Sequence, residues 1–190
     1  MTARLFTLLL AIVAIPVLCS SALGSQAREH LTPQEIDLVK DAQVLDKRID
    51  VFIKAADRRV LALNGTDSSS AKQVKKDSEF WGDLPSGTRA ELIGDIARIF
   101  EEAITNIDDV SARDENNPLI PKAVRKLAAA SSRIVELLKP AEAQAKSDAE
   151  LNSFDQLVEN ADSILQAANR LPPPVEKKGK SKTEKPKASN

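Results

Sequence analysis

Apolar residues recur at alternating steps of three and four along four long stretches of this sequence. That spacing places them on one face of an α-helix, so each stretch predicts an amphipathic helix. The seven-residue repeat also favours left-handed packing of the helices against one another. The stretches cover about residues 33–64, 88–113, 120–139 and 148–169. Their predicted core residues are, in the same order, Leu38, Ala42, Leu45, Ile49, Phe52, Ala56 and Leu63; Ile93, Ile96, Phe100, Ala103, Ile107 and Val110; Ile120, Val124, Leu127, Ser131, Ile134, Leu138 and Ala141; and Leu151, Phe154, Val158, Ala161, Leu165 and Ala168.

Start and stop signals bound the first of these helices clearly. Thr32, Pro33 and Glu35 have the spacing of a capping box with proline at the first helical position. The dipeptide at residues 64–65, Asn-Gly, is typical of a helix C-terminus. Between these signals one polar residue, Arg59, occupies a position that the apolar repeat assigns to the core.

We predict an all-α fold in which the four helices form an antiparallel, up-down-up-down bundle. Pro140 should bend or end the third helix near that point. The unusual element is one long loop between the first and second helices, residues 65–87, because connections of this length are uncommon in small domains. We expect a short helix near residues 70–80 within it. Phe80 and Trp81 lie at its end, where the tryptophan either caps the core or belongs to an exposed anchor for a partner.

Residues 1–27 have the layout of a secretory signal peptide. One positive charge precedes an apolar run of about 15 residues, which is shorter than a membrane-spanning helix requires, and small residues follow this run. Cleavage before Ser25 or Arg28 would remove Cys19, the only cysteine, together with the leader. We therefore expect a secreted or periplasmic protein whose mature form has no transmembrane segment.

The charge of the chain is divided between an acidic body and a basic tail. The formal net charge is −1, of which the tail, residues 172–190, holds +4 and Arg4 holds +1. The predicted helical domain, residues 28–171, therefore carries −6. Three successive prolines open the tail, and its composition predicts a disordered arm. Its lysines either keep the protein soluble and contact the acidic body, or bind weakly to an anionic membrane surface or envelope polymer.

The composition offers few groups for catalysis or for binding a cofactor. After the predicted leader the chain has no Cys, Met or Tyr, and its one histidine is His30, ahead of the first helix. Haem binding is not expected, because His30 is the one candidate axial ligand, and a thiolate nucleophile is missing. No Ser lies beside a base in a recognisable motif. The adjacent acids Glu101-Glu102 and Asp108-Asp109 point about 100° apart on a helix, which favours a solvated face over a metal site. The sequence predicts no enzyme activity, no cofactor and no metal.

These features predict an exported, non-enzymatic helical protein that acts by binding a protein or an anionic component of the cell envelope. We do not expect nucleic acid as a partner, because no aromatic residue lies among the tail lysines to stack on bases. Two alternatives fit the same pattern, namely a periplasmic holdase chaperone for unfolded proteins and a structural helical subunit. The candidate partner contacts are the aromatic pair of the long loop and four lysines of the tail: Phe80, Trp81, Lys177, Lys178, Lys180 and Lys182.

Overall fold

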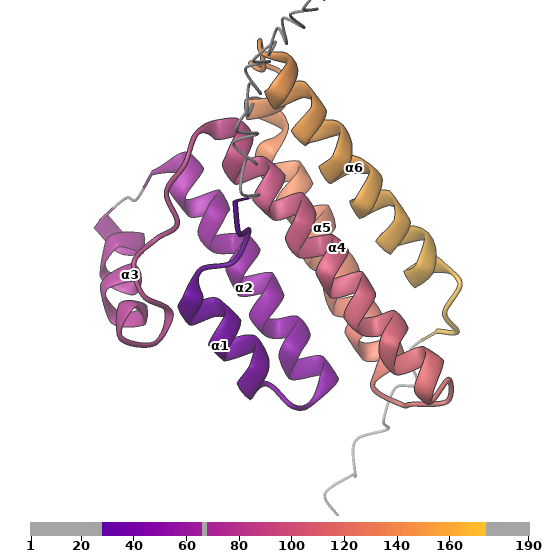
Figure 1. The fold of residues 1–190 in the computed structure, drawn as a ribbon. Helices are drawn as coiled ribbons and strands as arrows, with labels where there is room; N and C mark the ends of the chain where they lie inside the picture. Colours follow the sequence, from indigo (N-terminus) through magenta and orange to yellow (C-terminus); the bar gives the residue numbers. More distant parts are fainter. Residues whose placement is uncertain (1–27, 66–67, 174–190) are drawn as a thin grey trace, which may run out of the picture.

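Six α-helices form the part of the chain that this computed structural model describes (Figure 1). The described residues are 28–65 and 68–173, and no β-strand occurs within them, so the predicted all-α class is confirmed there. The predicted leader, residues 1–27, and most of the predicted tail, residues 174–190, lie outside the described residues. The helices are α1 (Pro33–Asp41), α2 (Leu45–Asn64), α3 (Ser68–Trp81), α4 (Arg89–Arg113), α5 (Ile120–Glu142) and α6 (Asp148–Asn169).

The single helix predicted for residues 33–64 is in fact two helices, α1 and α2, which corrects the prediction of four helices. α1 begins as predicted, and Thr32 and Glu35 form both bonds of the capping box. At the break that follows α1, the Nε atom of Arg48 donates to the carbonyl oxygen of Ala42 over 3.0 Å. The break turns α1 back beside α2, so residues 23 positions apart in the sequence come into contact. A continuous helix would separate such residues by about 35 Å.

The long helices α2, α4, α5 and α6 surround one core, but parallel helices lie side by side in it. α4 makes its most extensive contact with α6, and α2 contacts both α4 and α5. Ion pairs join α2 to α5 at a constant separation of 76 residues: Asp46–Lys122, Asp50–Lys126 and Asp57–Arg133. Hydrogen bonds join α6 to α4 at a constant separation of 63 residues: Ser153 to Ala90, and Asn160 to Ala97. A constant separation requires parallel helices, so extensive contacts occur between helices that are not sequence neighbours. The simple bundle, in which only antiparallel sequence neighbours pack side by side, is therefore not confirmed.

The core follows the predicted periodicity in α2, α4 and α5, whereas α6 is rotated from its predicted orientation. Leu151, expected in the core, is 44 % exposed. The buried side of α6 is formed instead by Phe154, Leu157, Ala161 and Ile164. The sequence has apolar residues at both 157 and 158 and at both 164 and 165, so its pattern fits either orientation. Packing against both α4 and α5 selects the observed one.

α5 also ends later than its proline suggested. Pro140 lies within the helix, which continues to Glu142. A proline so close to the C-terminus disturbs only the last turn, because few hydrogen bonds remain to be lost beyond it.

The long connection between α2 and α4 contains α3, in agreement with the short helix expected there. α3 lies at one edge of the molecule, beside α1 and on the opposite side from α6 (Figure 1). Among the other helices, only α1 brings its backbone close to that of α3, whereas α2 reaches α3 through long side chains. This position makes α3 the least enclosed of the described helices.

Candidate partner surface at helix α3

α3 has two faces of different character. The inward face consists of half-buried residues, and of these Trp81 packs against the hydrophobic core: Val74, Asp77, Ser78 and Trp81. The outward face consists of exposed residues, most of them charged: Lys72, Lys75, Lys76, Glu79 and Phe80. An amphipathic helix of this kind is stabilised by its inward contacts, while its outward face is free to meet solvent or a partner.

An ion pair fastens the middle of α3 to α2. Lys54 Nζ lies 2.7 Å from one carboxylate oxygen of Asp77, and Gln73 Nε2 donates to the other over 2.6 Å. The hydrogen bond from Lys54 lowers the pKa of Asp77, and the lysine charge and the Gln73 bond act in the same direction against the opposing effect of burial. Asp77 is therefore ionised at neutral pH, and the pair holds α3 in place under those conditions.

One buried side chain of α2, Arg58, holds the C-terminal end of α3. Its Nη2 atom donates to the carbonyl oxygens of Trp81, Gly82 and Asp83 over 2.5–3.2 Å. Its guanidinium carbon lies 5.7 Å from the centre of the Trp81 ring, which is within the range of a cation–π interaction. The last carbonyl groups of a helix lack intrahelical partners and carry partial negative charge, so a cation at this place stabilises the helix end.

Arg58 belongs to a buried charge cluster that links α1 to α2. Glu35 Oε1 accepts hydrogen bonds from Arg58 Nε over 3.1 Å and from Arg59 Nη1 over 2.6 Å. All three residues are at most 2 % exposed. One carboxylate thus faces two guanidinium groups, and carbonyl oxygens solvate the remaining positive charge. Those of His30 and Ala55 accept from Arg59 over 2.6 and 2.9 Å.

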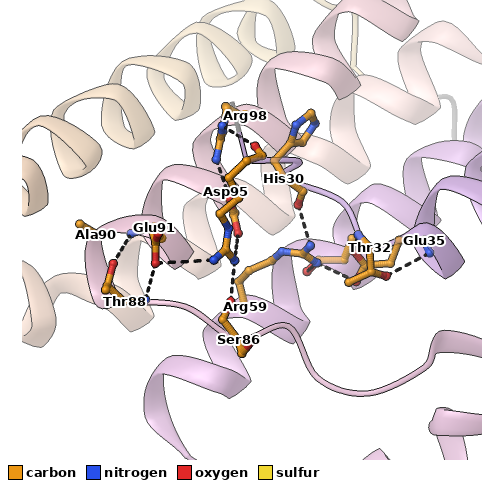
Figure 2. Close-up of polar contacts among 12 residues, drawn as sticks. His30, Thr32, Glu35, Arg59, Ser86, Thr88, Ala90, Glu91, Asp95 and Arg98 are labelled. Carbon is orange, nitrogen blue, oxygen red and sulfur yellow. Dashed lines mark hydrogen bonds and ion pairs between the residues drawn. The ribbon is translucent and has the colours of Figure 1, made fainter. Parts of the chain in front are cut away.

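The segment that precedes α1 is bound across the same region by charged side chains (Figure 2). The buried carboxylate of Asp95 pairs with Arg28 over 2.9 Å and with Arg98 over 2.6 Å. Arg98 also donates to the Arg28 carbonyl oxygen over 3.0 Å. His30 Nε2 lies 2.7 Å from a carboxylate oxygen of Glu102. These contacts tie the segment to α4 and, through Arg59, to the cluster on α2, so α3 is anchored on a firmly connected base.

The outward face of α3 carries the most exposed large hydrophobic side chain among the described residues. Phe80 is 71 % exposed. Lys72 and Lys76 precede it at steps of four residues, so all three side chains align along one stripe of the helix. Lys75 and Glu79 flank this stripe. The stripe therefore combines one exposed aromatic ring with a local excess of positive charge.

The structure separates the two aromatic residues that the sequence placed together. Trp81 packs inward against the core, which agrees with the expected cap, while Phe80 points outward. The four predicted tail contacts lie outside the described residues: Lys177, Lys178, Lys180 and Lys182. The cluster of Glu35 with Arg58 and Arg59 was not predicted from the sequence. Its one signal was the arginine at a core position.

Other kinds of site find little support in residues 28–65 and 68–173. No three His, Cys, Asp or Glu side chains converge there as a metal site would require. No helix in these ranges is long and apolar enough to cross a membrane. A cleft of about 470 Å³ is lined by Arg28, Arg59 and residues 83–86 among others, but both arginines already pair with buried carboxylates. The cleft is therefore part of the structural network.

No protein-family model, curated protein or solved structure matches this chain. The geometry of α3 is accordingly the basis of the functional argument.

Proposed function

We propose that this chain is an exported, non-enzymatic binding protein whose outward face of α3 contacts a partner in the cell envelope. The observation that carries the proposal is the exposure of Phe80 on a helix whose other aromatic residue, Trp81, is anchored by Arg58. Aromatic side chains dominate the energetics of protein surfaces that bind partners. A fixed helix presents such a side chain without a large loss of conformational entropy on binding.

Export by residues 1–27 and a second contact through Lys177, Lys178, Lys180 and Lys182 belong to the same proposal. Residues 170 and 171 separate the end of α6 from the tail. Because the tail and α3 belong to one chain, a contact through the tail lysines would strengthen one made by α3. The up-down-up-down direction of the four long helices is also retained as part of the proposal. The short connections from α4 to α5 and from α5 to α6 support it.

The distribution of exposed apolar side chains favours a dedicated binder over a holdase chaperone. Among the described residues, the exposed large hydrophobic side chains are dispersed: Val44 precedes α2, Phe80 lies on α3, Leu137 on α5 and Leu151 on α6. A holdase needs a contiguous apolar surface on which unfolded chains can settle. Scattered single residues are normal for a soluble surface, and Phe80 is distinguished by its greater exposure and by the lysines beside it.

Photocrosslinking from position 80 tests the proposal. A benzophenone amino acid replaces Phe80 in the full chain, and the envelope fraction of the producing cells is irradiated. The matched control carries the same amino acid at Leu137, which is 49 % exposed on α5. We expect a defined adduct from position 80 and none from position 137. Equal labelling from both positions, or no adduct from either, would contradict the proposal.

A further inference from the structure

We propose that the partner of the outward face of α3 is an anionic lipid bilayer, on which the helix lies at the level of the headgroups. This inference rests on the proposed function and names the partner of the same surface. Lys72, Lys76 and Phe80 are aligned along the helix, and Lys75 adds a third positive charge beside them. Helices that lie on membrane surfaces combine lysines with aromatic side chains in this way, because the ring enters the interface while the ammonium groups pair with phosphates.

The acidic residues of this region leave the outward face positive. Glu79 is exposed on it and offsets one of the three lysines. Asp77 points inward and is neutralised by Lys54. Asp83 lies two residues beyond the end of α3 and so does not belong to its outward face. The face that would meet a bilayer therefore has a net charge of about +2, and negative lipid headgroups attract it.

The charge of the described domain favours one orientation of that domain on such a surface. α6 contains five acidic residues and no Lys or Arg: Asp148, Glu150, Asp155, Glu159 and Asp162. Only Glu150 pairs with a cation in the described structure, Arg89. α6 lies at the opposite edge of the molecule from α3 (Figure 1). An anionic surface repels the α6 side and attracts the α3 side, so the described domain can approach it through α3.

The composition of the face distinguishes a bilayer from a protein partner. Lysine is depleted at the cores of protein interfaces, whereas here three lysines share one helix face with Phe80, the one exposed aromatic side chain among the described residues. A protein partner would also have to match a convex helical surface in shape, whereas a fluid headgroup layer adapts to it. Anchoring by Arg58 and Lys54 fixes the orientation of α3, so the lysines and Phe80 can reach the headgroups together.

Flotation with lipid vesicles tests the inference. The protein is purified from a host that exports it, so that every variant shares the same termini. It is mixed with vesicles of phosphatidylcholine alone, or of equal parts of phosphatidylcholine and phosphatidylglycerol. The test variants are the double variant Lys72→Glu/Lys76→Glu and the single variant Phe80→Ala. The matched controls are Lys47→Glu/Lys146→Glu, at two exposed lysines outside α3, and Leu137→Ala. Circular dichroism verifies that each variant is folded.

We expect binding to the anionic vesicles only. Each basic residue near an anionic surface strengthens binding about fivefold, so the double variant should bind at least about twenty-five-fold more weakly. Phe80→Ala should weaken binding about fivefold, because the ring no longer enters the interface. Both controls should bind within about twofold of the unaltered protein.

Equal binding to both kinds of vesicle would overturn the inference, and so would an equal loss of vesicle binding in the test and control variants. If the vesicles bind nothing while position 80 crosslinks to a protein, the bilayer is the wrong partner and the proposed function stands. If position 80 also yields no adduct, both proposals fail.

Discussion

Removal of the Arg58 guanidinium should release the end of α3 without unfolding the domain. Arg58→Met keeps most of the aliphatic stem but removes the bonds to three carbonyl oxygens and the contact with the Trp81 ring. Glu35 keeps its partner Arg59 at 2.6 Å, so no buried carboxylate is left without a cation. The free energy of unfolding should therefore fall by only about 1–3 kcal/mol, the effect of leaving polar groups without partners.

Glu35→Gln should be more damaging, although it changes fewer atoms. It leaves two buried arginines, Arg58 and Arg59, without a countercharge. Breaking a buried ion pair in this way costs about 3–5 kcal/mol. The glutamine can still accept the backbone bond of the capping box, so the loss measures the charge cluster and not the helix cap.

Urea denaturation with two probes separates these effects. Circular dichroism follows the whole helical domain, and the fluorescence of Trp81, the only tryptophan, follows the end of α3. In Arg58→Met the Trp81 emission should shift to longer wavelength in the native state and change at a lower urea concentration than the dichroism. In Glu35→Gln both transitions should move to lower urea by the larger amount. If Arg58→Met lowered the free energy of unfolding more than Glu35→Gln, the charge cluster would not work as described. An unchanged Trp81 spectrum in Arg58→Met would show that Arg58 does not hold the end of α3.

Three further predictions concern the attachment of α3 and the core. The pKa of Asp77 is lowered in the folded protein, so its ion pair with Lys54 stabilises α3 fully at pH values above the ordinary carboxyl pKa, near 4. This stabilisation disappears as the pH falls through the lowered pKa. Trp81 fluorescence should therefore show an acid transition that is smaller in Asp77→Asn. Gly82→Ala should destabilise the protein by about 1–2 kcal/mol in thermal unfolding, because φ at Gly82 is +66°. The control Gly94→Ala, within α4, should be neutral or stabilising by up to about 1 kcal/mol. Phe154→Ala should cost about 3–5 kcal/mol in urea denaturation and Leu151→Ala less than about 1 kcal/mol; similar losses would contradict the orientation of α6.

The sequence predicted the helices well where their boundaries and faces are set by local physics. The capping box of Thr32 and Glu35 forms as predicted, and most core positions of α4 are buried. Caps and helical periodicity act over a few residues, so they can be recognised in a single chain. α3 was expected near residues 70–80 as a short helix in a long connection, and it lies there.

Features that depend on distant contacts were missed. No Gly or Pro marks the break between α1 and α2. The break allows Glu35 to contact Arg58 and Arg59, which are distant in the sequence. Arg59 at a core position was the one trace of that cluster, and a sequence pattern alone does not reveal the partner of such a residue. The parallel contacts of α4 with α6 likewise follow from how all four long helices bury their apolar faces together.

The candidate site was predicted only in part. The long connection drew attention to Phe80 and Trp81, but their opposite orientations depend on the face of α3 that packs against the bundle. Arg58 holds Trp81 on the inward face of α3 through its contacts with the ring and the carbonyl oxygen. Nothing in the sequence around Arg58 distinguishes it from a surface arginine.

Lysine footprinting in the envelope fraction tests directly whether α3 is the surface that contacts the envelope. A brief treatment with an acetylating reagent, read by mass spectrometry, reports the accessibility of every lysine in the native envelope and in the purified protein. We expect strong protection of Lys72, Lys75 and Lys76 in the envelope, whereas Lys47 and Lys146 should react equally in both samples. Equal reactivity of the α3 lysines in the two samples would contradict the assignment of α3 as the contact surface.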